Sequence, residues 1–317
     1  MDFLQKKNQI LIGFIIYGQH TFKYLPHFLA SLKKQTFKDF KIIAFNNGVA
    51  NDENVKFLQA NYPEIEIIGG GDNLGFARAY NRMITRAFDA RVDYFLMTNC
   101  DMVYEPDVLE KLFQRLETDR ELGSDCPKIL KWDFAENKKT DIVDSYGVGL
   151  KSGLRFFDIG QGIKDNKKFR YARVIGPSGA CGLFRMAALE RVKEDDKYLD
   201  ERMFMYKEDC DLDYRLYLIH QESACVPEAV VYHDRTATGT GSSDAAAIKA
   251  RSGKSLDVRR WSLLNQQLIF KKYWHLQDFI SRLNIIFYLI KSFFYSLVFE
   301  QFLLKDYFTI FSRKAKL

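Results

Sequence analysis

Short apolar runs alternate with amphipathic segments along the first third of the chain. Residues 10–17, 41–45 and 65–68 are apolar-rich runs of strand length. Between them, residues 24–34 and 52–61 carry apolar side chains at the three- and four-residue spacing of a helix. This strand–helix–strand rhythm, with its short connections, predicts a parallel sheet whose crossovers are right-handed helices.

A fourth apolar run, residues 94–98, leads into Asn99-Cys100-Asp101. Ligands of open α/β sheets bind beyond the carboxyl ends of strands, which places the Asp101 carboxylate where chemistry takes place. An Asp that only forms a turn or caps a helix would fit the same pattern. Residues 102–107 are expected to begin the next helix, with Pro106 in its first turn, where proline is tolerated.

The densest group of acidic residues lies between residues 198 and 216. Four acidic side chains, Glu208, Asp209, Asp211 and Asp213, fall within six positions. Like charges this close together raise the pKa of one member, as a general base that works near neutral pH requires. The alternative is an ordinary acidic helix start, stabilised by the helix dipole.

Two further segments complete the candidate site. Residues 176–185 are rich in Gly, Ser and Ala, and such small residues let the backbone approach a ligand or another chain segment closely. A final apolar run, residues 224–232, ends at His233. A lone His is usually structural, but a His at a strand end, in a chain with two acidic foci, is a candidate metal ligand.

The C-terminal tail is basic and amphipathic. Residues 251–317 contain 12 Lys/Arg against 4 Asp/Glu. Over residues 276–311, apolar side chains recur every three or four positions, which predicts one apolar face on a helix or a pair of helices. The longest unbroken apolar run, residues 285–290, is much shorter than the roughly 20 residues of a spanning helix. We therefore expect the tail to lie on an anionic membrane surface without crossing it, or else to pack on the catalytic domain or in a homodimer.

Composition narrows the classes of function. The glycines fit neither GxxxxGK[ST] nor GxGxxG, which argues against the common ATP- and NAD-binding folds. The five cysteines lie at least 15 positions apart, which excludes a CxxC site and favours a reducing compartment. The first apolar run is too short to span a membrane and lacks a signal-peptide cleavage site. Nucleic-acid binding is not expected, because only the basic tail favours it.

Five segments, taken in order, resemble the family 2 glycosyltransferases of the GT-A fold, particularly their bacterial rhamnosyltransferase-like branch. These segments are residues 42–48, 72–81, 98–101, 178–180 and 204–212. The resemblance implies an α/β fold with a Rossmann-like, mostly parallel central sheet flanked by helices. It also implies a catalytic domain over residues 1–245. The amphipathic pattern of the tail, in turn, predicts a C-terminal helical extension over residues 246–317.

The resemblance assigns roles to individual residues. Thr98-Asn99-Cys100-Asp101 is similar to the Asn-Pro-Asp variant of the DXD motif, so Asp101 would bind Mn²⁺ or Mg²⁺, with His233 as a second ligand. The acidic segment is similar to the family's Tyr-x-Glu-Asp-x-Asp-Leu. Asp209 would therefore accept the proton of the acceptor hydroxyl, and Glu208 would steady the base or the acceptor. The donor would contact Tyr17, Asn46, Asn47, Asn73, Gly75, Phe76, Arg78, Asn81, Asn99, Gly179 and Ala180.

The implied reaction is an inverting, metal-dependent transfer of a sugar from a dTDP- or UDP-linked donor, with dTDP-rhamnose among the expected donors. The acceptor would be a hydroxyl of a cell-surface polysaccharide or a lipid-linked oligosaccharide precursor, reached from the cytoplasmic face of the membrane. Two positions depart from the family. Asn46 stands where Asp is usual. Its amide oxygen can still accept a hydrogen bond from the N3–H of uracil or thymine, but this bond lacks the negative charge that an Asp would contribute. Asn99 replaces the first Asp of a full DXD motif, which lowers metal affinity.

Two other functions fit parts of this pattern. A non-catalytic nucleotide-sugar-binding module would share the fold, but it would not need the intact set of Asp101, Glu208, Asp209 and His233. A sugar-phosphate nucleotidyltransferase would need a basic glycine-rich loop after the first strand, and residues 18–21 do not supply one.

Overall fold

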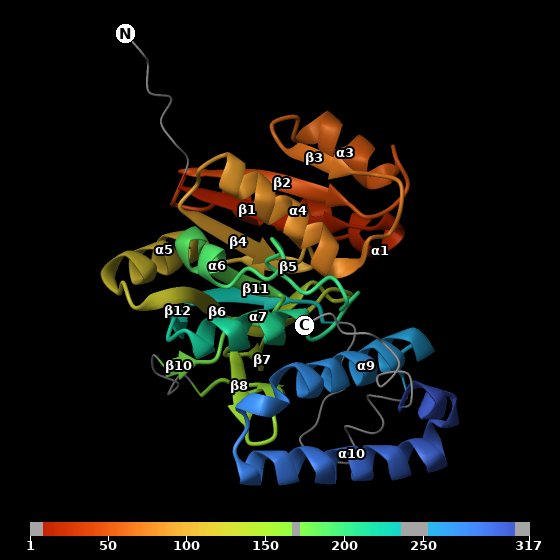
Figure 1. Ribbon diagram of the computed structural model, residues 1–317. Helices are drawn as coiled ribbons and strands as arrows, with labels where there is room; N and C mark the ends of the chain where they lie inside the picture. The colour runs from red at the N-terminus through yellow and green to blue at the C-terminus, as the bar shows by residue number, and fades with distance from the viewer. Residues whose placement is uncertain (1–8, 167–171, 236–252, 308–317) are drawn as a thin grey trace.

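The computed structural model describes residues 9–166, 172–235 and 253–307 (Figure 1). Ten described strands form one sheet in the order β10-β12-β6-β11-β4-β1-β2-β3, with β5 also paired to β12 and β7 to β6. The remaining two strands, β8 and β9, form a separate hairpin. The strands are β1 (Ile10–Ile16), β2 (Phe40–Asn46), β3 (Glu66–Gly69), β4 (Tyr94–Thr98), β5 (Met102–Tyr104), β6 (Leu122–Asp133), β7 (Lys138–Ser145), β8 (Val148–Lys151), β9 (Arg155–Asp158), β10 (Ala172–Val174), β11 (Cys181–Arg185) and β12 (Glu222–His233).

The N-terminal part of the chain forms the parallel half of this sheet. β1 pairs in parallel with both β2 and β4, and β3 pairs in parallel with β2. The crossovers are helical, as the strand–helix rhythm predicted, and the mostly parallel α/β architecture is confirmed. The helices of this half are α1 (Gly18–Phe22), α2 (Leu25–Lys33), α3 (Glu53–Asn61) and α4 (Gly75–Asp89).

Burial on both faces explains why the first strands are nearly all apolar. The even-numbered side chains of β1, from Ile10 to Ile16, pack with α2 and α5 (Val108–Thr118). Leu11 points the other way, into the cluster formed with α4 and α6 (Met186–Arg191). Successive side chains of a strand alternate between the two faces, so a strand covered on both sides reads as a continuous apolar run.

The segment after Asp101 corrects one prediction. Residues 102–107 do not begin a helix: Met102–Tyr104 form β5, which pairs antiparallel with β12, and α5 begins only at Val108. Pro106 therefore precedes the helix instead of lying in its first turn. The physical reason is tertiary, because Met102 and Tyr104 are buried in the core beside α2 while their backbone joins the ladder of a distant strand.

The C-terminal extension consists of two long helices, α9 (Leu256–Tyr273) and α10 (Phe279–Phe299), with the short 3₁₀ turns η1 (Trp274–Leu276) and η2 (Gln301–Leu303). They lie at the end of the molecule far from α3 (Figure 1). Ile269, Phe270 and Ile285 form a third apolar cluster with Leu154 and Phe156 of the β8–β9 region. The expected helical extension is therefore present. The expected boundary at residues 245–246, and residues 308–311 of the expected membrane segment, lie outside the described residues.

Candidate active site

The two predicted metal ligands lie side by side. Asp101 follows β4, and His233 is the last residue of β12. The β5–β12 ladder pairs His233 with Met102, and the backbone N–H of Asp234 donates to the carbonyl of Asp101 at 3.0 Å. As a result, His233 Nε2 lies 3.3 Å from Asp101 Oδ1. The short strand β5, which the sequence did not reveal, brings these two residues together.

A row of charged side chains supports the imidazole from behind. His233 Nδ1 lies 2.8 Å from Oδ2 of Asp144, at the end of β7, and Asp144 also accepts from Arg235 Nη1 at 3.3 Å. Arg235 in turn donates to Asp158 at 2.8 Å. Burial alone would lower the pKa of His233, but the carboxylates of Asp101 and Asp144 raise it to about 10. Nothing in the local sequence singled out Asp144, Asp158 or Arg235, because only the fold places them here.

The residues present fit a divalent cation. The Oδ1 atom of Asp101 is buried and forms no well-aligned hydrogen bond among the described residues, and its charged neighbour there is the imidazole of His233, 3.3 Å away. A cation bound between the two side chains would satisfy this oxygen. A cation that displaces the proton from Nε2 of His233 would gain a nitrogen ligand from the imidazole, and such a donor set suits Mn²⁺ better than Mg²⁺. A carboxylate on the far side of the imidazole is the usual support of a metal-bound His.

The predicted catalytic carboxylates stand at the start of α7 (Glu208–Leu218). Asp209 Oδ2 accepts from the backbone N–H of Gly179 at 2.9 Å, and its Oδ1 accepts from the N–H of Cys210 at 2.8 Å. A Cβ atom at Gly179 would lie 2.9 Å from Asp209 Oδ2, so a side chain there would push the carboxylate away. The small-residue segment found in the sequence thus packs directly against the acidic helix.

Two other acids of this cluster are buried, with carboxylate oxygens that lack a hydrogen bond in the described part of the chain. Glu208 Oε2 and both carboxylate oxygens of Asp213 accept no hydrogen bond within the described parts of the chain. Burial, and next to it the charge of Asp209, raises the pKa of both Glu208 and Asp213 well above the ordinary carboxyl range. From the sequence, the clustered like charges were expected to raise the pKa of one acid. In the structure, the acids with a raised pKa are these two residues.

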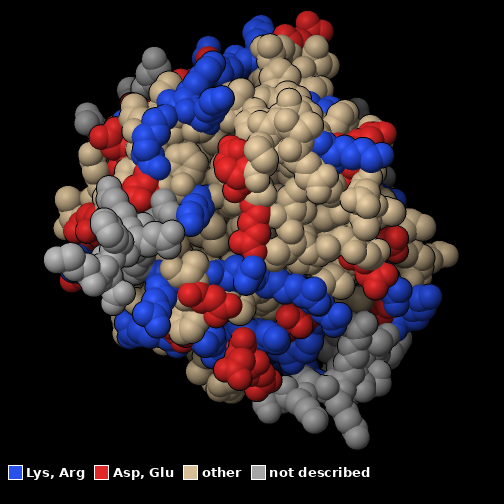
Figure 2. All heavy atoms as spheres, turned by 90° about the horizontal axis from the view of Figure 1, so that it is seen from above, with Lys and Arg blue, Asp and Glu red and all other residues tan. Residues whose placement is uncertain are grey.

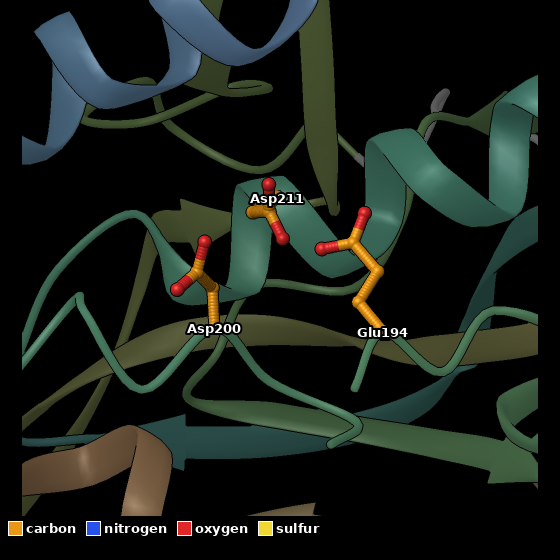
Figure 3. A group of neighbouring side chains, drawn as sticks. All are labelled: Glu194, Asp200 and Asp211. Atoms are coloured by element: carbon orange, nitrogen blue, oxygen red, sulfur yellow. The ribbon is translucent and has the colours of Figure 1, made fainter. Parts of the chain in front are cut away.

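The fourth acid, Asp211, belongs to a different site. Its carboxylate converges with those of Glu194 and Asp200 (Figure 3), in a group whose ligand atoms lie within 4.8 Å of one another. The ammonium of Lys272 already occupies the space that a metal ion would take. Its Nζ lies 2.9 and 3.0 Å from the two oxygens of Asp211 and 3.7 Å from Asp200, and it also binds Glu194. This cluster therefore connects α9 to α7 through ion pairs.

The predicted donor residues near β2 and β3 shape one turn. Asn47 Oδ1 accepts from the N–H of Leu74 at 2.7 Å, and its Nδ2 donates to the carbonyl of Gly75 at 3.1 Å. Asn73 Oδ1 accepts from the N–H of Gly75 at 2.9 Å. Asn46 closes its own turn, accepting from Gly48 at 2.9 Å and donating to Val49 at 3.0 Å.

The start of α4 is joined to the chain segment before α7. Gly75 has a φ of +77°, and a Cβ there would lie 2.3 Å from the carbonyl oxygen of Phe204, to which the N–H of Phe76 donates at 2.7 Å. Asn81 forms four hydrogen bonds to residues 198–201. Arg78 is exposed and lies 3.7 Å from Glu201, at the edge of a cavity of about 520 Å³.

The remaining predicted donor residues link the two acidic sites. Asn99, which precedes Asp101 by two positions, donates its N–H to the carbonyl of Ala180 at 2.9 Å. The neighbouring Gly179 holds Asp209. Tyr17, which follows β1, is 43% exposed, with its ring stacked on His20.

Comparison with known proteins gives a consistent picture. The family model described as glycosyl transferase family 2 matches residues 13–193. The chain is 28% identical over 244 residues to N-acetylglucosaminyl-diphospho-decaprenol L-rhamnosyltransferase of two Mycobacterium tuberculosis strains, CDC 1551 / Oshkosh and H37Rv, covering 72% of this chain and 76% of the relative.

Solved structures share the fold at low identity. GalNAc-T7 with UDP, GalNAc and Mn²⁺ gives a TM-score of 0.57 at 11% identity over 83% of this chain. The match covers 48% of that protein, so the present chain spans about half its length. The mannosyltransferase PcManGT from Pyrobaculum calidifontis, with GDP-Man and Mn²⁺, gives a TM-score of 0.50 at 11% identity. That match covers 96% of this chain and 84% of PcManGT.

Proposed function

The chain belongs to glycosyl transferase family 2 and is a glycosyltransferase, and from this premise we propose that it is an inverting, metal-dependent enzyme. The proposed donor is a dTDP- or UDP-linked sugar, with dTDP-rhamnose first, and the proposed acceptor is a hydroxyl of a lipid-linked glycan precursor. The curated relative supports this choice, because its name describes an L-rhamnosyltransferase that acts on a decaprenyl-diphosphate-linked N-acetylglucosamine.

One observation carries the proposal: a single loop connects the candidate metal ligand and the candidate base. Ala180 accepts from Asn99, beside Asp101, and Gly179 donates to Asp209. A sugar held over this loop would have the diphosphate-binding carboxylate at one end and the base at the other. Small residues at positions 179 and 180 leave room for it.

The reaction assigns one task to each group. The carboxylate of Asp209 accepts the proton of the acceptor hydroxyl while that oxygen attacks the anomeric carbon. The bond from the anomeric carbon to the nucleoside diphosphate breaks on the opposite side, which inverts the configuration. Asp101 and His233 would hold a divalent cation, which neutralises charge on the departing diphosphate. Burial raises the pKa of Glu208 well above the ordinary carboxyl range, and the task proposed for this residue is to steady the base or the acceptor.

The donor's base is proposed to lie near Asn46. Its side-chain carbonyl already accepts one hydrogen bond, from Gly48, and an amide oxygen can accept a second from the N3–H of uracil or thymine. The cavity beside Arg78 and Asn81 is also lined by Ile68 of β3, whose neighbour Gly69 pairs with Asn46. Tighter binding of GDP than of UDP and dTDP would contradict this placement.

The proposed location is the cytoplasmic surface of the membrane, bound through α10. Helix α10 is continuous over 21 residues, so it has the length and composition to cross a membrane, which the interrupted apolar runs had not suggested. Its inner face is engaged, however: Ser281 accepts from the N–H of Gly153 at 3.0 Å, and Ile285 is fully buried. A crossing helix would lose these contacts, so we favour a helix lying in the membrane interface.

The outer face of α10 supports a lipid surface as the partner. It exposes ten large apolar side chains, Phe279, Ile280, Leu283, Ile286, Phe287, Ile290, Phe294, Leu297, Val298 and Phe299. Residues 279–299 include two basic side chains and no acidic one, which suits anionic lipid headgroups. The face opposite the C-terminal helices differs, because basic and acidic side chains are interspersed on it (Figure 2).

Two variants test the enzyme proposal. Asp101→Asn should abolish Mn²⁺-dependent binding of dTDP, because the carboxylate that holds the cation is lost. Asp209→Asn should leave that binding within about twofold and lower transfer by 10²-fold or more, roughly the contribution of a general base. Calorimetry measures the first effect, and release of dTDP from dTDP-rhamnose with a polyprenyl-diphosphate-linked N-acetylglucosamine as acceptor measures the second.

The two results separate the alternatives. Wild-type binding by Asp101→Asn would overturn the metal assignment. Binding of nucleotide sugars by the wild type without any release of nucleoside diphosphate would favour the non-catalytic module.

A further inference from the structure

The turn before α7 is held in an unfavourable backbone conformation. Tyr206 and Lys207 have φ angles of +73° and +76°, so two consecutive residues with side chains occupy the left-handed region. Residues other than glycine enter this region at a cost, and they remain there only where the surroundings hold them. Lys207 is also the N-cap of α7, so this turn determines where the helix begins. It therefore determines where Glu208 and Asp209 point.

One side chain from the C-terminal extension holds this turn. The amide nitrogen of Asn265, on α9, donates to the carbonyl of Met205 at 2.9 Å and to that of Tyr206 at 2.7 Å. Asn265 is only 4% exposed, so these carbonyls have a fixed partner shielded from water. One turn earlier on α9, the ring of Trp261 packs on Phe204, with 4.8 Å between centroids.

The segment that precedes α7 is also bound by α4, the helix that begins among the predicted donor residues. The carbonyl of Phe204 accepts from the N–H of Phe76, at the start of α4. Residues 204–206 are thus hydrogen-bonded to both α4 and α9. Helix α9 belongs to the C-terminal extension and, like α7, lies beyond residues 13–193, which the family model matches.

We propose that Asn265 is a positioning residue of the transferase site: by bonding both carbonyls of the left-handed turn, it keeps the Asp209 carboxylate against Gly179 and aimed at the acceptor. This inference rests on the proposed function, in which Asp209 is the base. Asn265 does not contact the donor or the acceptor in this role. It acts through the backbone of residues 205–207.

The first test compares two amides on the same helix. Asn265→Ala should lower kcat by about 10- to 100-fold, because small displacements of a catalytic group carry penalties of that order. The KM for the nucleotide sugar should change less than about twofold, since α4 keeps its own contacts. Gln266→Ala is the matched control: Gln266 is equally buried and donates to Leu154 at 3.0 Å, away from the turn. It should lose a similar amount of thermal stability and keep its kcat.

The second test asks whether the loss of kcat in Asn265→Ala is caused by backbone strain in the left-handed turn. Glycine adopts positive φ without penalty, so adding Lys207→Gly to Asn265→Ala should restore kcat at least threefold. The same change in the wild type should not raise kcat. If Lys207→Gly alters kcat by the same factor in both backgrounds, or if Gln266→Ala loses as much kcat as Asn265→Ala, the proposal is wrong.

A structural readout keeps the inference separate from the proposed chemistry. Amide hydrogen exchange over residues 204–212 should be faster in Asn265→Ala than in the wild type or Gln266→Ala, whatever reaction the enzyme catalyses. Unchanged exchange there would overturn the positioning role even if the transferase activity is confirmed. Full activity of Asp209→Asn would instead overturn the proposed base. Should the Ala variant fail to fold, Asn265→Leu, which keeps the same number and branching of side-chain heavy atoms but donates no hydrogen bond, replaces it in each comparison.

Discussion

At the scale of single residues, the site depends on buried charged side chains whose partners hold each of them in one orientation. Asp144 is the clearest example, because it is almost fully buried and bonds the imidazole of His233 on the side away from Asp101. Its other oxygen binds Arg235, so its orientation is fixed. A residue in this position would fix which ring nitrogen faces the proposed cation.

Replacing Asp144 should therefore weaken metal binding without removing it. We expect Asp144→Ala to lower the affinity for Mn²⁺ by about 10- to 100-fold, the range seen when the support of a metal-bound His is lost. Titration of free Mn²⁺, followed by electron paramagnetic resonance, measures this directly. Asp158→Ala, which removes a carboxylate that reaches the His only through Arg235, is the control and should have a smaller effect. Equal losses in both variants would mean that the general negative charge matters and the bond to His233 does not.

A second buried acid makes a prediction about pH. Asp125 lies in β6 with neither carboxylate oxygen hydrogen-bonded within the described residues, and burial raises its pKa well above 3.8. In the unfolded chain it ionises near 3.8, whereas the folded protein retains the proton to higher pH. The folded state then binds more protons, so Asp125 makes the unfolding free energy fall as the pH rises above 3.8.

Asp125→Asn removes this contribution. The unfolding free energy of the variant minus that of the wild type should increase with pH above about 4, by up to about 1.4 kcal/mol per pH unit until the raised pKa is reached. Urea denaturation at several pH values between 4.5 and 7.5 measures this difference. Other buried acids, such as Glu208 and Asp213, are present in both proteins and cancel. A difference that does not vary with pH would show that Asp125 is ionised in the folded protein.

At the scale of elements, α9 is the structural link between the C-terminal extension and the catalytic part of the chain. Its Lys272 lies among three carboxylates, and the adjacent Tyr273 donates to Asp211 at 2.7 Å. Asp211 is fully buried and also accepts from Arg215 at 3.0 Å, so α7 and α9 share one compact charged network. Such a network is costly to break from one side, because it leaves charges buried without their partner.

Lys272→Met should therefore destabilise the whole fold. The expected loss is roughly 3–5 kcal/mol, the cost of removing one member of a buried ion pair. Chemical denaturation measures it, with Lys291→Met on the exposed side of α10 as a control expected within about 0.5 kcal/mol of the wild type. A small loss at Lys272 would mean that water or another cation takes its place, and it would reopen the acidic cluster as a metal site.

At the scale of the whole molecule, one end is apolar and the opposite end carries mixed charge. The apolar end is the outer face of α10, and the candidate active site lies between the two ends, at the carboxyl end of β4 (Figure 1). If α10 rests in the lipid headgroups, a lipid-linked acceptor would reach Asp209 from the end of the molecule that α10 covers. This arrangement favours membrane docking over a purely structural role for the extension.

The membrane prediction can be tested on the full chain. The double variant Phe287→Glu/Phe294→Glu places two charges on the outer face of α10, where both rings are more than half exposed. It should lose co-sedimentation with phosphatidylglycerol vesicles at least tenfold, whereas Phe88→Glu, at a half-exposed ring on α4, should sediment like the wild type. Phosphatidylcholine vesicles should bind less protein than anionic ones. A wild-type protein that stays in the supernatant, and that the double variant converts from dimer to monomer, would instead identify this face as a subunit interface.

The sequence by itself determined the features that depend on local pattern. The parallel strands and their crossover helices were predictable, because side-chain periodicity is a property of consecutive residues. The acidic start of α7 and the small residues at 178–180 could be recognised for the same reason. Asp101 was found because a strand that ends in a carboxylate is a local signal. The order of these segments was enough to suggest the family that the comparisons confirm.

Only the tertiary structure decided which residues meet. Met102–Tyr104 became a strand because β12 was available to pair with it, and that pairing placed His233 beside Asp101. Asp144, Lys272 and Asn265 stand in segments whose local pattern reveals nothing about the site. They became important because burial gives a hydrogen bond or an ion pair far more weight than it has in water. Such weight depends on the neighbours that the completed fold supplies, and these neighbours are distant in sequence.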